Sequence, residues 1–311
     1  MDNDTTMAES GEETKSIQKQ VYEPLGREAR MFFVDVHRMA NKNRSRKNDE
    51  NHHIYSVDGE NFNKAAKITD IPAKANDVLY VDVIPVELTE EFIELLRRGV
   101  RVFYLRRATM LAKKREELGL LKTARNDIRA MIAIEPRWFR EVNEDILVMR
   151  RLTCAYRSLL KSHQSLLNRM KALSGVERDV LKDAIKDLEK RMTTMAKIID
   201  PEAIKRIPSY SRVVEALAIV GDNHLMAREA LAEIMPYVER TRSYSRLKAF
   251  FGLYKGSKGT VKIYSKPARH ALARLTTAVL HKAHHKAKDE ERILRRIWKT
   301  VKERERLEAP A

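Results

Sequence analysis

The stretch "ARMFFVDVH", residues 29–37, decides how the first part of the chain folds. Phenylalanine and valine favour β-strands, so the run predicts a buried strand. Asp35 lies inside it, and a buried charge is costly unless it is paired or bound to a metal. Asp35 is therefore the first candidate site residue.

Three more β-rich runs follow, and one amphipathic helix joins the last two. The runs are "HHIYSVDG" at 52–59, "DVLYVDVIPV" at 77–86 and "VRVFYL" at 100–105, and the helix is "TEEFIELLRRG" at 89–99. Together they predict a mixed α/β sheet. Residues 38–51 are almost wholly polar and predict a mobile loop, either solvated or in contact with nucleic acid.

Asp82 is a second acid inside a strand-like run. If its strand lies beside that of Asp35, the two carboxylates can converge on one cation, as in metal-assisted phosphoryl transfer. Two strand-end acids that face solvent would give the same pattern. The sequence by itself leaves both interpretations open.

The composition indicates a polyanionic partner. The 311 residues carry a formal net charge of +17, with a pI near 9.8. No apolar run approaches the ~20 residues of a membrane-spanning helix, and residues 1–28 predict a disordered acidic tail rather than a targeting segment. The single cysteine, Cys154, excludes an intramolecular disulfide. We therefore expect a soluble cytoplasmic protein that binds phosphate-rich molecules.

Residues 139–200 predict an antiparallel coiled-coil hairpin with a break at Ser174 and Gly175. Its core positions recur at heptad spacing and are Val142, Met149, Tyr156, His163, Met170, Leu152, Leu159, Leu166, Leu173, Leu181, Ile185, Leu188, Met192, Met195 and Ile199. Such regular stripes can also recruit a second subunit. His163 in the seam is more typical of a hydrogen-bonded core residue than of a ligand.

Residues 201–311 predict a helical domain. Its last helix has an apolar face surrounded by Lys and Arg, which suits docking on the core and contact with phosphates. His281, His284 and His285 have a spacing that can bind zinc. They have no Cys or acid beside them before Asp289, so a metal site there is the weaker interpretation.

The order of motifs resembles the DEDD transposases and Piv-type DNA invertases of insertion sequences, the insertion-sequence 110 family. The motifs are "VDVHR", an acid after a later strand, "GLLKTARNDIRA", a coiled coil, "IPSYSRVVEALAIVGD" and "YSKPARHALARLTTAVLHKA". The resemblance spans almost all of the chain after residue 30. It implies a RuvC-like domain of RNase H fold at 29–138 and a C-terminal transposase domain at 201–311.

The resemblance also implies the metal ligands. Asp35 matches the first acid of the family, and Asp82 matches the second, with Glu87 as an alternative. The closing motif K-T-D-x-x-D-A has Ala124 in place of its first acid, so that Asp127 is the remaining one. Asp35, Asp82 and Asp127 are thus the implied Mg²⁺ ligands, and the loss of one acid weakens binding of a second ion.

In the C-terminal domain, Ser257 is the matching candidate for the catalytic serine of the family. Lys255 and Lys258 could supply a positive field for its alkoxide, although "GSKGT" is also a plausible flexible turn. The family has glycines that approach a DNA phosphate where this chain has Ser209 and Ser211. Close backbone approach is less favourable with serine, but the hydroxyls could bind phosphate.

The function implied is a DNA transposase or site-specific recombinase that acts by Mg²⁺-assisted serine transesterification. Its implied partners are DNA, a structured guide RNA and further copies of the chain, assembled as a dimer or tetramer through the coiled coil, with a nucleoid-associated location. The alternative is a catalytically degenerate descendant that acts as a nucleic-acid-binding oligomer. A generic helical adaptor is a third possibility.

Overall fold

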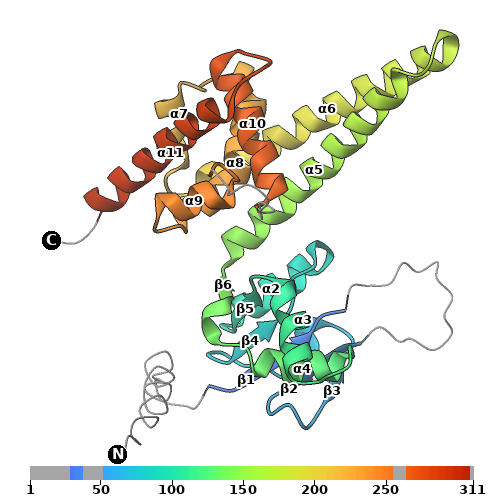
Figure 1. Cartoon of the computed structure of the whole chain (residues 1–311), viewed down its shortest axis with the longest axis vertical. Helices are drawn as coiled ribbons and strands as arrows, with labels where there is room; N and C mark the ends of the chain where they lie inside the picture. Colours follow the sequence, from blue (N-terminus) through green and yellow to red (C-terminus); the bar gives the residue numbers. More distant parts are fainter. Residues whose placement is uncertain (1–28, 38–51, 255–263, 309–311) are drawn as a thin grey trace, which may run out of the picture. The chain divides into compact units, whose positions relative to one another are not determined.

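The computed structural model describes residues 29–37, 52–254 and 264–308. The chain divides into two compact units, Met1–Val142 and Asn143–Ala311. The first contains a mixed six-stranded sheet with helices, and the second is built of helices, which agrees with the expected α/β plus all-α class (Figure 1). The expected N-terminal tail, the polar loop and Ser257 lie outside the described residues.

The sheet of unit 1 has the strand order β3-β2-β1-β4-β5-β6. Its strands are β1 (Met31–Asp35), β2 (His53–Ser56), β3 (Asn63–Ala65), β4 (Val78–Val81), β5 (Arg101–Leu105) and β6 (Phe139–Val142). The central strands β1, β4 and β5 are parallel, whereas β2, β3 and β6 are added antiparallel. The carboxyl ends of the three parallel strands therefore lie at one edge of the sheet.

Three α-helices accompany this sheet. They are α2 (Thr89–Arg97), α3 (Ala108–Glu117) and α4 (Ala124–Ile132), and short 3-10 turns lie at Ile68–Asp70, Val86–Leu88 and Pro136–Trp138. Helix α4 packs on β1 and β2, while α2 packs on β5. The Tyr80 ring lies at the centre of the core under α4, 5.1 Å from Phe33 and 4.9 Å from Phe139 between ring centroids. Aromatic packing thus fixes α4 on the sheet.

A second set of contacts holds α4 to the loop between β2 and β3. The guanidinium groups of Arg125 and Arg129 lie 5.5 and 5.3 Å from the centre of the Phe62 ring. Arg129 Nε also donates a hydrogen bond to the Gly59 carbonyl at 3.1 Å. These cation–π contacts use the opposite side of the helix from Asp127, so they orient that acid towards the sheet.

Unit 2 is arranged around one central helix, α8. Its helices are α5 (Glu144–Met170), α6 (Gly175–Arg206), α7 (Tyr210–Leu217), α8 (Leu225–Glu239), α9 (Tyr244–Phe250), α10 (Lys266–Leu280) and α11 (Ala287–Leu307), with a 3-10 turn at Asp222–His224. Helix α8 packs against α5, α6, α10 and α11. The apolar face of α11, with Ile293, Leu294, Ile297 and Val301, is buried as expected.

Helices α5 and α6 form a long antiparallel hairpin (Figure 1). At its base, Met149 and Tyr156 belong to the same buried cluster as Met192 and Ile199. His163 Nε2 lies 3.1 Å from Glu189 Oε1 of the facing helix. The hairpin and the C-terminal helices therefore belong to one compact unit, whereas their sequence predicts two separate segments.

The predicted heptad is wrong at its first position, Val142, which does not lie in a helix. Val142 lies in strand β6 and pairs with Val102 of β5, where it is buried. The Asn143 side chain accepts a hydrogen bond from Ile146 N at 3.0 Å and so caps α5. Helix formation therefore starts only at Glu144, because a cap of this kind stops the helix from extending backwards.

Among the described helices, none is both long and apolar enough to cross a membrane.

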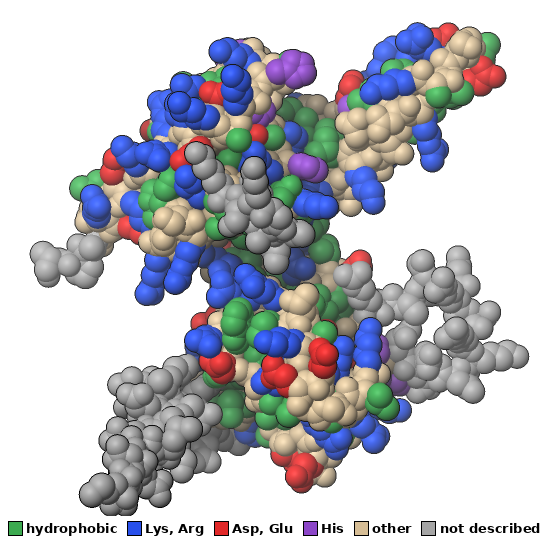
Figure 2. All heavy atoms as spheres, viewed as in Figure 1, with side chains coloured by type: hydrophobic (Ala, Val, Ile, Leu, Met, Phe, Trp, Pro, Cys, Tyr) green, Lys and Arg blue, Asp and Glu red, His purple; other side chains and the backbone are tan. Residues whose placement is uncertain are grey.

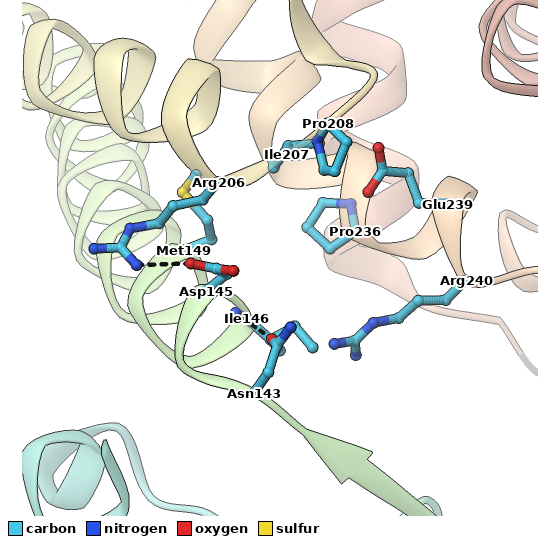
Figure 3. A pocket seen from close by; sticks show the side chains of 10 residues that line it. All are labelled: Asn143, Asp145, Ile146, Met149, Arg206, Ile207, Pro208, Pro236, Glu239 and Arg240. Atoms are coloured by element: carbon cyan, nitrogen blue, oxygen red, sulfur yellow. Dashed lines mark hydrogen bonds and ion pairs between the residues drawn. The ribbon is translucent and has the colours of Figure 1, made fainter. Parts of the chain in front are cut away.

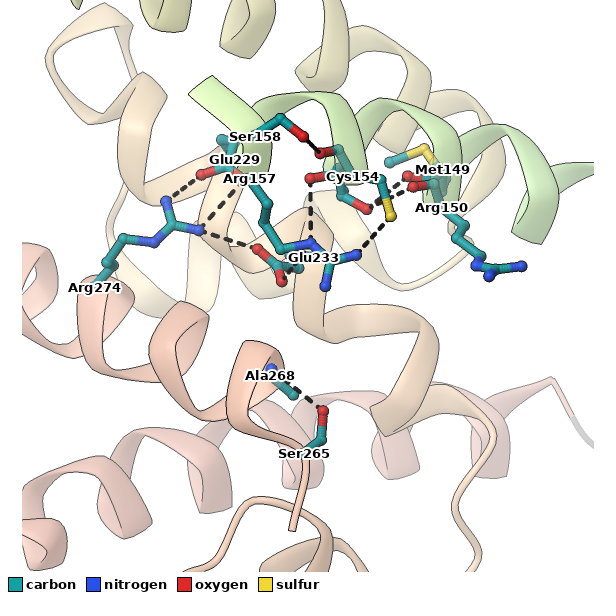
Figure 4. A network of polar contacts seen from close by, with 11 residues as sticks. Met149, Arg150, Cys154, Arg157, Ser158, Glu229, Glu233, Ser265, Ala268 and Arg274 are labelled. Atoms are coloured by element: carbon teal, nitrogen blue, oxygen red, sulfur yellow. Dashed lines mark hydrogen bonds and ion pairs between the residues drawn. The ribbon is translucent and has the colours of Figure 1, made fainter. Parts of the chain in front are cut away.

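Two buried acids and two partly buried arginines form a network between α5, α8 and α10 (Figure 4). Arg274 pairs with Glu229, and its Nη2 lies 3.1 Å from Glu233 Oε2. Arg157 Nε approaches Glu233 Oε1 at 3.5 Å. Burial raises the pKa of Glu229 and raises the pKa of Glu233 to about 7, although Arg274 opposes both shifts. Arg274 is therefore the main counter-ion of two acids in the core.

We predict that Arg274→Met destabilises unit 2 by about 3–5 kcal/mol, because it leaves buried carboxylates without their partner. Urea unfolding can be followed by the fluorescence of Trp298 in a Trp138→Phe background, since the chain has one tryptophan in each unit. Arg292→Met is the control, because that side chain is exposed and its ion pair with Asp289 is 3.7 Å long. Equal losses in the two variants would contradict this role of Arg274.

Candidate functional site

The site begins with the register of two parallel strands. Val34 of β1 is aligned with Val81 of β4. Asp35 is the last residue of β1, and Asp82 immediately follows β4. Residues at equivalent positions of adjacent strands point to the same face of a sheet. Asp35 and Asp82 are therefore neighbours at the carboxyl edge, as the sequence analysis expected if the two strands paired.

Local hydrogen bonds fix both acids. The Val36 amide donates to Asp82 Oδ1 at 3.0 Å, which ties the end of β1 to the end of β4. His37 Nε2 lies 3.4 Å from Asp35 Oδ2. The His37 amide donates to His53 Nδ1 at 3.2 Å, and burial lowers the pKa of His53 to about 4, so that this ring is a neutral acceptor. The turn after β1 is thereby held in place.

Asp127 enters the site from the first turn of α4. The Thr123 side chain accepts a hydrogen bond from the Asn126 amide at 3.2 Å and caps the helix. Asp127 forms an ion pair with Arg115 of α3, and both side chains are mostly buried. The helix starts at Ala124, whose methyl group offers no metal ligand.

The three carboxylates form one electrostatic cluster. Burial, with a smaller contribution from the charges of Asp35 and Asp127, raises the pKa of Asp82 to about 7. Burial also raises the pKa of Asp35, with Asp127 acting in the same direction and His37 and Arg115 opposing. Mutual influence of this kind requires that the acids lie close together, and such perturbed groups are typical of functional sites.

The geometry favours Asp82 over Glu87 as the second acid. Glu87 is exposed in the 3-10 turn Val86–Leu88 and is not among the charges that shift Asp35 or Asp82. Nothing in the sequence decided this, because both residues follow the same strand. The strand register favours Asp82, because it places that acid beside Asp35.

The donor set suits one hard divalent cation better than two. Mg²⁺ keeps several waters and is commonly bound by one or two carboxylates. Asp35 and Asp82 can provide those two carboxylates. Asp127 is directed to Arg115 instead. Within the described ranges, no group of three or more His, Cys, Asp or Glu side chains is placed to hold a metal ion together. His285, one of the three histidines whose spacing can bind zinc, instead contacts Thr277 and Glu290.

Ser209 does not offer its hydroxyl to a phosphate. It is buried, and its amide donates to Glu239 Oε1 at 3.0 Å. Its Oγ accepts a hydrogen bond from Arg304 Nη1 at 3.2 Å. With φ near −90°, Ser209 also needs no glycine-like backbone. The suggested phosphate contact is therefore wrong for Ser209, because internal partners already use both of its polar groups.

A basic hollow lies along α11. Its volume is about 740 Å³, and it is basic because four cations outnumber two acids around Trp298: Arg242, Lys299, Lys302 and Arg306 against Glu303 and Glu305, of which Glu305 pairs with Lys302. Lys302 Nζ lies 4.7 Å from the centre of the Trp298 ring. Many Lys and Arg side chains are visible on the surface of unit 2 in Figure 2. An aromatic ring among cations is suited to a nucleic-acid backbone and its bases, and this agrees with the cationic rim expected for the last helix.

A smaller notch of about 200 Å³ lies at the base of the hairpin (Figure 3). Arg206, at the end of α6, reaches Asp145 at 2.8 Å and Glu202 at 2.6 Å. No motif in the sequence indicated this joint, because its charged residues are far apart along the chain. The ion pairs give it a structural role, connecting the two ends of the hairpin.

Comparison of the sequence with models of known protein families and with curated proteins gives no match. The acid cluster of unit 1 and the basic hollow of unit 2 are therefore the features from which a function can be argued.

The raised pKa of Asp82 predicts a pH-dependent stability of unit 1. The folded pKa of about 7 exceeds the ordinary 3.8, so the folded chain binds more protons between these values, and the free energy of unfolding falls as pH rises through them. We expect wild type to lose roughly 2–4 kcal/mol relative to Asp82→Asn between pH 4 and pH 8.

Urea unfolding of both proteins, followed by Trp138 fluorescence in a Trp298→Phe background, measures this difference. Glu60→Gln, which changes an exposed acid of the same unit, should keep the wild-type pH dependence. Parallel pH profiles for wild type and Asp82→Asn would contradict the assignment.

Proposed function

We propose that the chain is a divergent DNA recombinase of the DEDD transposase type, which acts on phosphodiesters at the acid cluster of unit 1. The observation that carries this proposal is the grouping of Asp35, Asp82 and Asp127 at the carboxyl edge of β1 and β4. Strand order and direction in unit 1 are compatible with a RuvC-like domain of RNase H fold.

Each acid has a distinct task in this proposal. Asp35 and Asp82 would hold one Mg²⁺, which when bound would activate an attacking oxygen and stabilise a leaving oxygen. Asp127 keeps Arg115 in the site, and Lys122 adds positive charge near Asp35. These cations would orient a phosphate beside the acids. Ser257, outside the described residues, is the proposed nucleophile of the C-terminal domain.

The proposed partners are DNA, a structured guide RNA and further copies of the chain. The net charge of +17 and the basic hollow on α11 favour nucleic acid. Leu173, Val176 and Val180 at the far end of the hairpin are exposed apolar side chains. We propose that they belong to a coiled-coil interface of a dimer or tetramer. Sedimentation velocity tests this proposal, and a monomeric chain would exclude it.

A nucleic-acid-binding protein without catalysis is the second candidate. It is favoured by the ion pair between Asp127 and Arg115, together with Ala124 at the start of α4. Both features reduce the number of carboxylates that can hold metal. In this case the basic surface of unit 2 would carry the function, and the acid cluster would be a remnant.

We predict that Asp35→Asn lowers Mg²⁺-dependent breakage of DNA by at least about a hundredfold, because it removes charge stabilisation at the reacting phosphate. Supercoiled plasmid and mixed single- and double-stranded oligonucleotides are the substrates, and Glu60→Gln is the matched acid control. Wild-type protein that binds these DNAs equally with and without Mg²⁺ and breaks none of them would favour the second candidate.

We also predict that Lys299→Ala and Arg306→Ala each weaken DNA binding and each reduce the slope of log K against log salt by about 1, since each removes one phosphate contact. Fluorescence anisotropy over a range of NaCl concentrations measures both quantities. Lys182→Ala is the control, because Lys182 lies on the hairpin and pairs with Asp179 at 2.7 Å. Unchanged salt slopes in the two α11 variants would exclude the hollow as a contact surface.

A further inference from the structure

The ion pair between Arg115 and Asp127 is built into the fold. The chain leaves α3 through Gly119 with φ near +65°, and the Leu120 amide donates to the Arg115 carbonyl at 2.8 Å. This C-terminal turn fixes the last turn of α3. The Thr123 cap fixes the first turn of α4. Arg115 and Asp127 are therefore brought together by two defined helix ends.

The pair is also well shielded. The side chains of Arg115 and Asp127 are only 14% and 12% exposed, respectively. A guanidinium group remains charged at every accessible pH and matches a carboxylate through parallel donors. In a site with little water, such a pair is much less screened than a surface salt bridge. A divalent ion would have to displace Arg115 before it could use Asp127.

Charge balance leads to the same conclusion. Asp35, Asp82 and Asp127 carry three negative charges when ionised. One guanidinium and one divalent cation already neutralise them, before the positive charge of Lys122 near Asp35 is counted. A second divalent cation would leave the cluster with excess positive charge while Arg115 stays in place. Position 124, which could have supplied another carboxylate from α4, is alanine.

We infer that Arg115 is an internal cation that takes the place of a second metal ion, so that the acid cluster holds one divalent cation at Asp35 and Asp82. The inference rests on the proposed function, because it assumes that these two acids bind a metal. It departs from the two-ion site of metal-assisted phosphoryl transfer, since here a residue of the chain supplies the second positive group. Asp127 holds Arg115 in this position through their ion pair.

Calorimetric titration of the full chain with Mn²⁺ tests this inference. Wild type should bind one ion at this site, and Asp35→Asn should bind none there. Arg115→Ala should either bind a second ion or bind the first at least about tenfold more tightly, because Asp127 becomes available. Arg115→Lys, which keeps the charge, should resemble wild type more closely than Arg115→Ala does.

The double variant Arg115→Ala with Asp127→Asn separates the inference from a loss of folding. It neutralises the buried carboxylate that Arg115 pairs with, so it should stay folded by circular dichroism and return to the wild-type Mn²⁺ stoichiometry. Identical Mn²⁺ binding by wild type and Arg115→Ala, or two ions bound by wild type, would overturn the inference while leaving a metal site intact. Absence of Mn²⁺ binding in all variants would overturn the proposed metal site itself.

Discussion

The parallel pairing of β1 with β4 is the constraint on which the candidate site depends. Because Val34 lies opposite Val81, the residues that follow them, Asp35 and Asp82, lie at the same level of the sheet. Neither acid could be tolerated alone in an apolar strand without a partner. The Val36 amide donates a hydrogen bond to the side chain of Asp82. One of the site acids thus also ties the end of β1 to the end of β4.

A comparable constraint organises unit 2. Glu229 and Glu233 lie on the buried side of α8, the helix that contacts most of its neighbours. They are stable there because Arg274 of α10 and Arg157 of α5 converge on them. Buried ion pairs often contribute more to a specific arrangement than to net stability. The network accordingly selects one arrangement of the hairpin against the C-terminal helices. Apolar packing alone would allow several arrangements.

Features that depend on local periodicity could be predicted from the sequence. Features that depend on contacts between distant residues could not. The strands around Asp35 and Asp82 and the two hairpin helices follow from the spacing of apolar residues. Strand β6 was missed, because the short segment Phe139–Val142 gains its strand character only by pairing with β5. The partnership of Arg115 with Asp127 was also missed. It arises from the geometry of two helix ends, and no periodic pattern encodes that geometry.

The opposite charges of the chain constrain how it can work on a polyanion. A net charge of +17 attracts polyanions such as nucleic acid over long distances, whereas three clustered carboxylates repel the phosphate that would approach them in the proposed function. Burial lessens this repulsion by raising the pKa of Asp82 to about 7, so that one acid is partly neutral at physiological pH. A bound cation would reverse the balance, because it makes the ionised form favourable. Binding of cation and of phosphate at this edge is therefore expected to be mutually reinforcing, with Arg115 setting how much charge remains to be neutralised.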